Sequence, residues 1–175
     1  MVNDIKFRLK DKIFFFLAIT GLILAFYLSI FDSNTKDNNG DWQSFSEMYK
    51  NLSDRDKLDL KIQDNIFHVE VARSENSRHQ GLGNRDFLPD NSGMLFVFSQ
   101  KGRYAFEMRD MKIDLDFIFI KNGEVLEITK NIPLNFKGIL RGNGDYDSVL
   151  EIRAGWADQY GVIVGDKIFI NKSVD

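Results

Sequence analysis

Residues 115–129, LDFIFIKNGEVLEIT, carry the clearest structural pattern in the chain. The segments 115–121 and 124–129 have the apolar, β-branched and aromatic composition that is typical of strands. Lys121-Asn122-Gly123 stands between them, and Asn-Gly is a preferred dipeptide of the two-residue hairpin turn. Because side chains alternate between the two faces of a strand, both faces of the first segment are apolar apart from Asp116. The stretch predicts a hairpin whose first strand places Asp116 in a buried or half-buried space.

Similar patterns flank this hairpin. From Leu58 onward apolar and polar residues alternate, which predicts a second hairpin over 58–72. A helix is expected to follow to Gln80, N-capped by Ser74 and ended by Gly81. Further short strands are predicted at 93–99, 103–109, 149–153 and 166–170, with a long loop over 130–147.

These elements predict the fold class of residues 58–171. Many short strands with one or two short helices indicate a mostly β, α+β domain. We expect a compact antiparallel sheet, either barrel-like or arranged as a sandwich.

An apolar segment, IFFFLAITGLILAFYLSIF, occupies residues 13–31 and contains no charged side chain. As a helix it would extend about 28 Å, close to the thickness of the hydrocarbon core of a bilayer. Basic residues predominate before it and acidic residues after it, so the positive-inside rule places the N-terminus in the cytoplasm. We therefore expect a cytoplasmic leader at 1–12, a transmembrane signal anchor at 13–31, and an extracytoplasmic C-terminal domain held at the cell membrane.

A cleaved signal peptide is the alternative interpretation of this segment. Its apolar core usually has about 7–15 residues and ends at small residues, whereas residues 27–31 are bulky here. The pattern favours an uncleaved anchor. Residues 32–57 are expected to be a linker with a short amphipathic helix at 44–52, which could pack on its own domain, on the membrane or on a partner. Residues 172–175 would form a tail.

Charge and composition exclude several functions. The chain has a net charge of −3, to which residues 1–31 contribute +2, so the remainder carries −5. This acidic balance argues against nucleic acid as a partner. The chain has no cysteine, which removes disulfides, thiol catalysis and cysteine metal sites. Neither His68 nor His79 stands at the spacing of a catalytic or zinc set, so no catalytic residue, metal or cofactor is predicted.

Several motifs, in order, resemble the domain of unknown function 192 family over about residues 58–171. They are Arg78-x-x-Gly81-Leu82, Gly93-Met94-Leu95-Phe96-Val97-Phe98, Phe106-x-Met108, Ile113-x-Leu115-Asp116, and Val149-Leu150-Glu151. The resemblance implies a small β domain, often secreted or membrane-anchored, and carries no established activity. This chain departs from the family pattern where Gly83, Glu107 and Asp114 stand in place of the usual Met, Trp and Pro.

Asp116 is the first candidate for a functional residue. A buried carboxylate without a partner costs several kcal/mol, so a cationic partner is expected, and Arg78 or Arg85 are the best candidates. Two interpretations remain open. The pair could clamp the helix to the sheet, or it could form the charged floor of a ligand pocket.

The sequence therefore leaves three functions open. The first is a binding or accessory module for a small polar ligand, a glycan or an envelope protein; its candidate ligand-binding residues are Arg78, Arg85, Met108, Asp116 and Glu151. The second is a hydrolase of envelope polymers that uses paired carboxylates such as Asp116 and Glu151. The third is a structural protein that recruits a membrane partner through helix 44–52.

Overall fold

The computed structural model describes residues 42–172. The expected leader (1–12), anchor (13–31) and first part of the linker (32–41) lie outside the described residues, as do residues 173–175. Among residues 42–172, no helix combines the length and the apolar character that crossing a bilayer requires.

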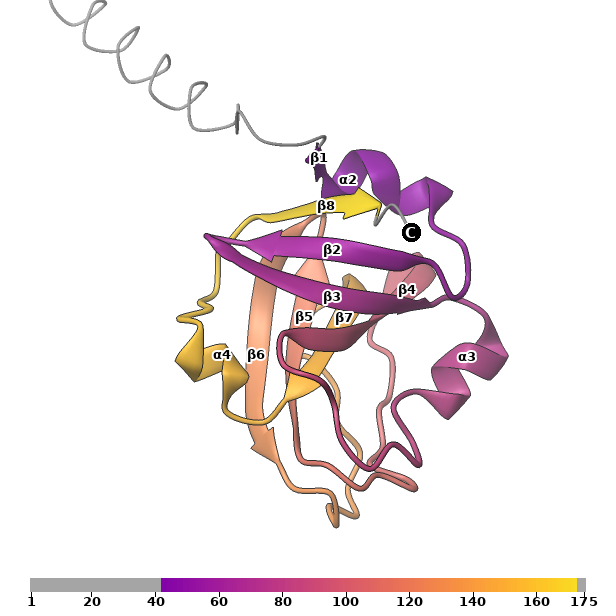
Figure 1. Ribbon diagram of the computed structural model, residues 1–175. Helices are drawn as coiled ribbons and strands as arrows, with labels where there is room; N and C mark the ends of the chain where they lie inside the picture. The colour runs from indigo at the N-terminus through magenta and orange to yellow at the C-terminus, as the bar shows by residue number, and fades with distance from the viewer. Residues whose placement is uncertain (1–41, 173–175) are drawn as a thin grey trace, which may run out of the picture. The chain divides into compact units, whose positions relative to one another are not determined.

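The described residues form one eight-stranded sheet in the order β1-β8-β2-β3-β4-β7-β5-β6 (Figure 1). The strands are β1 (Gln43–Ser44), β2 (Lys57–Ile62), β3 (Asn65–Ala72), β4 (Ser92–Gly102), β5 (Leu115–Lys121), β6 (Glu124–Ile132), β7 (Tyr146–Arg153) and β8 (Ile168–Lys172). The helices are short: α2 (Phe45–Met48), the 3-10 helix η1 (Tyr49–Asn51), α3 (Glu75–Gln80) and α4 (Trp156–Gln159). The prediction of a mostly β fold with a few short helices is confirmed.

The strands do not close into a barrel, and they form one sheet instead of the two of a sandwich. Strands β1 and β6 are the edges. Near one end, β6 meets the segment before β8 through an isolated bridge between Glu124 and Lys167, and the Ile168 amide donates to the Gly123 carbonyl at 2.9 Å. These few bonds join the edge strand β6 to the start of β8, the strand next to the other edge, without a continuous ladder between them.

One strand pair also contradicts the expected antiparallel sheet. Strands β3 and β4 are parallel, with Val71 opposite Leu95. Parallel neighbours need a crossover connection, and here α3 and the loop that follows it provide one. Alternation of apolar residues shows that a segment is a strand, but it says nothing about the direction of its partner.

Two further elements differ from their predictions. Residues 103–109 do not form a strand; only Phe106 pairs, through a bridge to Leu140. The buried and exposed residues do alternate there, but the segment lies over the sheet instead of adding to it. The helix expected at 44–52 is divided into α2 and η1, and its apolar residues Phe45 and Leu52 are buried in the core of the domain.

The central strands are buried on both faces, as the sequence of the first strand indicated. Every residue of β5 except Lys121 is buried, and so is every residue of β7 except Arg153. Phe117 stands directly opposite Glu151, and Asp116 stands opposite Ile152. Because opposed residues share a face, Glu151 and Asp116 point to opposite faces of the sheet. Helices α3 and α4 lie at opposite sides of these strands in Figure 1.

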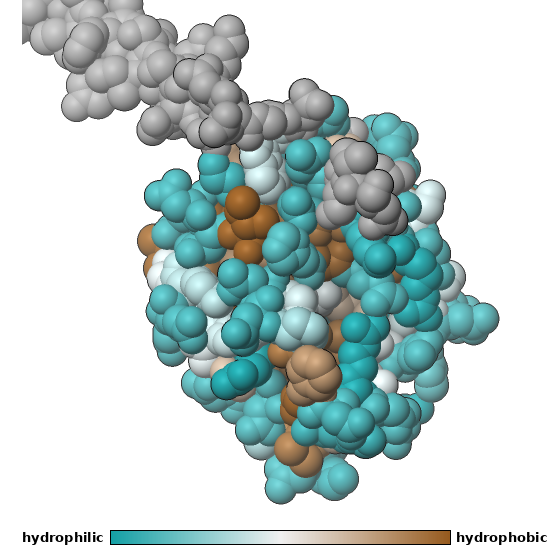
Figure 2. All heavy atoms as spheres, in the orientation of Figure 1, coloured by the Kyte–Doolittle hydropathy of each residue, from teal (hydrophilic) through white to brown (hydrophobic). Residues whose placement is uncertain are grey.

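Hydrophilic residues cover most of the face shown in Figure 2, and apolar residues reach the surface in smaller areas between them. The most exposed large apolar side chains of the described residues, Phe87, Ile139, Ile163 and Val164, belong to three separate loops. Single exposed apolar residues of this kind are normal on the surface of a folded domain and need no functional explanation.

Candidate functional site

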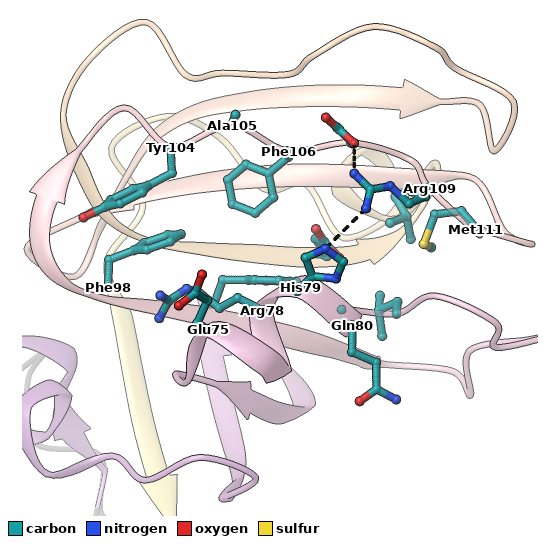
Figure 3. A pocket seen from close by; sticks show the side chains of 16 residues that line it. Glu75, Arg78, His79, Gln80, Phe98, Tyr104, Ala105, Phe106, Arg109 and Met111 are labelled. Carbon is teal, nitrogen blue, oxygen red and sulfur yellow. Dashed lines mark hydrogen bonds and ion pairs between the residues drawn. The ribbon is translucent and has the colours of Figure 1, made fainter.

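A cleft of about 340 Å³ opens between α3, the segment 104–111 and one face of the sheet (Figure 3). Arg78, His79 and Gln80 reach it from α3, and residues of 104–111 line the other side. The sheet contributes Phe96, Phe98, Leu115 and Glu151. The cleft therefore exists because residues 103–109 fold over the sheet, where the sequence had predicted another strand.

Aromatic side chains make up much of its wall. Phe98 and Tyr104 stack with their ring centroids 3.7 Å apart, and Phe96 and Phe106 meet edge to face at 5.4 Å. The Tyr104 hydroxyl donates to the Gln100 carbonyl at 2.7 Å, which fixes the outer ring. Rings held in this way provide a flat apolar surface against which a ligand can pack.

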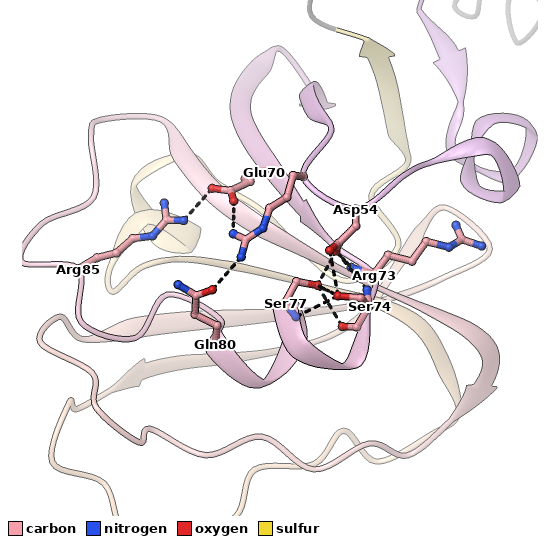
Figure 4. A network of polar contacts seen from close by, with 8 residues as sticks. Asp54, Glu70, Arg73, Ser74, Ser77, Gln80 and Arg85 are labelled. Atoms are coloured by element: carbon pink, nitrogen blue, oxygen red, sulfur yellow. Dashed lines mark hydrogen bonds and ion pairs between the residues drawn. The ribbon is translucent and has the colours of Figure 1, made fainter.

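Polar contacts fix helix α3 at the edge of the cleft (Figure 4). Ser74 is the N-cap, and its hydroxyl accepts a hydrogen bond from the Ser77 amide at 3.1 Å, as the sequence predicted. The Asp54 carboxylate accepts from the Arg73 and Ser74 amides, at 2.8 and 3.1 Å, and from the Ser74 hydroxyl at 2.9 Å. The hydrogen bond from the Ser77 hydroxyl, with these others, holds the pKa of Asp54 well below its ordinary value.

The C-terminal end of α3 is fixed as well. Gly81 ends the helix with φ of +50°, and a Cβ there would stand 3.3 Å from the Phe96 ring. The absence of a side chain at this position lets the helix lie directly on the aromatic wall.

The cationic side chains of the cleft already have partners. Arg109 forms an ion pair with Glu107 at 2.6 Å, and its other terminal nitrogen lies 3.3 Å from Nε2 of His79 (Figure 3). The Arg78 guanidinium donates to the carbonyls of Arg73 and Val97 and lies 5.2 Å from the centre of the Phe98 ring. Both arginines are thus held by groups of the protein itself.

Glu151 differs from these arginines because its carboxyl group has no partner among the described residues. Its residue is only 5% exposed, yet it lines the cleft. Its neighbours on the adjacent strands are Met94 and Phe117, both apolar. Among the described residues its carboxyl group has no hydrogen-bond or ion-pair partner, and burial raises the pKa of Glu151 to about 8. It is a buried acid whose hydrogen-bonding groups remain available to a molecule in the cleft.

Asp116 has a different environment from the one predicted. It is fully buried, but its carboxylate accepts from two backbone amides, Asn131 at 2.7 Å and Ala157 at 2.9 Å. The expected ion pair with Arg78 or Arg85 is wrong. Asp116 clamps β6 and the start of α4 to β5 on the face of the sheet opposite the cleft, so it does not form the floor of this pocket.

The other two predicted site residues, Arg85 and Met108, also lie outside the cleft. Arg85 pairs with Glu70 at 2.7 Å, and Arg55 contacts the other oxygen of the same carboxylate at 2.5 Å (Figure 4). Burial raises the pKa of Glu70, but the hydrogen bonds from the two arginines outweigh it and leave the pKa lowered. Met108 is buried in the core and does not line the cleft. Of the five predicted residues, the structure brings Arg78 and Glu151 into one cleft.

The other residues of the cleft are not among the five candidate ligand-binding residues. His79 does not stand at a catalytic or zinc spacing, and Tyr104 and Arg109 belong to a segment that is predicted as a strand. Gly102, the last residue of β4, is the sequence signal that could have shown that the chain leaves the sheet before 104–111.

Comparison with known proteins identifies relatives but no activity. Residues 58–170 match the family described as DUF192, uncharacterized ACR. A protein from Sinorhizobium meliloti 1021, provisionally described as a transcription regulator, superposes with a TM-score of 0.60 at 27% identity, over 65% of this chain and 91% of that one. A protein of unknown function from Novosphingobium aromaticivorans gives a TM-score of 0.60 at 30% identity, over 64% of this chain and 82% of that one. No curated protein matches the chain. The family match covers most of the described residues and agrees with the motifs noted in the sequence, and the chain belongs to the DUF192 family.

Proposed function

We propose that this chain is a membrane-anchored, extracytoplasmic binding module that holds a small polar ligand, or a polar group of a glycan or partner protein, in the cleft beside α3. One observation carries the proposal: Glu151 is buried at the cleft, and no residue within 42–172 pairs with its carboxyl group. Buried polar groups in folded proteins are almost always hydrogen-bonded, so such a group in a concave, aromatic-lined site is a natural ligand contact.

The two alternative functions receive less support. A hydrolase with paired carboxylates needs both groups across one cleft, whereas Asp116 and Glu151 point to opposite faces of the sheet. Recruitment of a partner through residues 44–52 needs an accessible apolar face, whereas Phe45 and Leu52 are buried in the domain.

Ligand binding is tested by measuring the thermal midpoint of the full chain, in micelles of a neutral detergent, against a panel of sugars, cell-wall fragments and divalent cations. A ligand that binds the folded state raises the midpoint by mass action. Ala105 is exposed at the cleft, so Ala105→Trp is expected to fill the cleft and abolish the rise. The control Lys137→Trp places the same side chain on an exposed loop outside the cleft and is expected to retain it. A rise that survives in Ala105→Trp would place the binding elsewhere.

The anchor and its orientation have a separate test that uses the absence of cysteine in the chain. A single cysteine at Lys137 is expected to react with a membrane-impermeant maleimide in intact cells, and one at Asn3 only after lysis. The full chain is expected to resist extraction from membranes by alkaline carbonate. Labelling of both positions in intact cells, or release by carbonate, would contradict the proposed topology.

A further inference from the structure

The charged side chains that line the cleft differ in whether they have a partner within the protein. Its lining contains three carboxylates, Glu75, Glu107 and Glu151, and two guanidinium groups, Arg78 and Arg109. Glu107 neutralises Arg109, and Arg78 is bound by backbone carbonyls and by the Phe98 ring. With these five groups ionised, the cleft has one negative charge more than it has positive charges, and Glu151 is the buried carboxylate of the three.

The Glu151 carboxylate, which has no partner among the described residues, determines which chemical group a ligand must supply. An ionised carboxylate only accepts hydrogen bonds, so its partner must be a donor, and a cationic donor gives the strongest contact. An anionic ligand would have to displace groups that already hold the two arginines. A compact ammonium group can instead reach Glu151 directly, and burial makes that charge-assisted bond stronger than it would be in water.

The rest of the cleft indicates the body of the ligand. Phe96, Phe98, Tyr104 and Phe106 offer ring faces and edges beside the acid. Aromatic walls bind apolar groups and also attract a nearby cation through the negative potential of the ring face. A cavity of about 340 Å³ admits one ring with a short chain.

We propose that the cleft recognises a primary amine on an apolar or aromatic body, whose ammonium group pairs with Glu151. This inference rests on the proposed function, since it names the ligand class of the same cleft.

The test uses three probes that share a phenylethyl body and differ in the polar end group: 2-phenylethylammonium, 2-phenylethanol and 3-phenylpropionate. They are titrated into the full chain in neutral micelles, with the methyl resonance of Met111, which lines the cleft, as the readout. We expect the amine to bind at least about tenfold more tightly than the alcohol or the acid, and Glu151→Gln to reduce its affinity to that of the alcohol. The control Asp145→Asn removes an equal negative charge from an exposed loop outside the cleft and is expected to keep the preference.

A pH titration identifies Glu151 as the partner. The amine must displace the proton that Glu151 holds at neutral pH, so its affinity should rise about tenfold per pH unit from pH 6 toward 8 and then level off. The charged and titratable groups that line the cleft with Glu151 are Glu75, Arg78 and His79 from α3, and Tyr104, Glu107 and Arg109 from segment 104–111. Its partners on the neighbouring strands are the apolar Met94 and Phe117. Because histidine also changes charge near neutral pH, His79→Gln is measured alongside and is expected to keep the slope.

The possible outcomes separate this inference from the proposed function. Equal binding of all three probes would leave the cleft as a binding site and overturn the amine assignment, as would a preference for the propionate. Failure of every probe up to about 10 mM would also overturn the assignment. A ligand found in the sugar and cell-wall panel, and lost in Ala105→Trp, would then still support a binding module.

Discussion

Replacing Glu151 by Gln should stabilise the folded chain at neutral and alkaline pH. Burial raises the pKa of this carboxyl group from 4.5 to about 8. Between these two values the folded state holds a proton that the unfolded state has released. The free energy of unfolding must therefore fall as pH rises through this window, because the unfolded state binds fewer protons. Gln is close in shape to Glu and has no charge to bury, so the free energy of unfolding of the variant does not fall in this way as pH rises.

The size of the effect follows from the same window. Each pH unit between about 4.5 and 8 lowers the free energy of unfolding by about 1.4 kcal/mol relative to the neutral variant. At pH 7 the accumulated difference is about 3 kcal/mol, and above pH 8 it approaches about 5 kcal/mol. Such values are a large part of the stability of a domain of this size.

Urea denaturation of the full chain and of Glu151→Gln, followed by tryptophan fluorescence at pH 5, 7 and 9, measures this difference. The two curves should nearly coincide at pH 5, and the variant should be more stable at pH 7 and most clearly so at pH 9. Glu75→Gln serves as the control, because Glu75 is exposed and should show no such divergence from the parent. A difference between Glu151→Gln and the parent that is the same at pH 5 and pH 9 would refute the reasoning, since it would mean that Glu151 ionises normally in the folded state.

Three further substitutions test the scaffold. Asp116→Asn should lower the free energy of unfolding by about 2–4 kcal/mol, because an amide cannot accept from two backbone N–H groups as the carboxylate does; an unchanged urea midpoint would contradict the clamp. Gly93→Ala should cost about 2–3 kcal/mol, since its Cβ would stand 2.5 Å from a backbone oxygen of β7, whereas Gly144→Ala meets nothing nearer than 3.5 Å and should change stability by less than about 0.5 kcal/mol in the same assay. Ser77→Ala removes a buried hydroxyl that donates to Asp54 and should cost about 1–2 kcal/mol by thermal or urea unfolding; a neutral result would show that the network does not hold α3.

The local elements of the fold could be read from the sequence because their signals are local. The hairpin at 115–129 depends on alternation and on Asn-Gly, and helix α3 depends on Ser74 and Gly81, so neighbouring residues suffice. The parallel pairing of β3 with β4 and the open edges β1 and β6 depend on contacts between distant segments. Alternation does not encode them, and this is also why 103–109 was predicted as a strand although it lies over the sheet.

The candidate site was predictable to the same extent. Of the candidate ligand-binding residues, Arg78 and Glu151 line one cleft, but the residues opposite them come from segment 104–111, whose path the sequence did not reveal. Asp116 was selected for being polar in an apolar strand, which identifies a buried group but not its partner. Two backbone amides donate hydrogen bonds to its carboxylate here, and a sequence does not show which backbone amides will lie near a side chain.

Asp116 and Glu151 show how two buried acids of this fold differ in their surroundings. Both are buried carboxylates on the adjacent strands β5 and β7, one residue out of register, so burial alone does not distinguish them. The single-residue offset turns Asp116 toward backbone amides that satisfy it, and turns Glu151 toward a cleft where no described residue does. Burying an acid without a partner lowers stability, and the fold tolerates that cost only at the position that faces a cavity. A substitution that gave Glu151 a partner within the protein, such as Met94→Lys on the neighbouring strand, should therefore remove amine binding while the protein still folds.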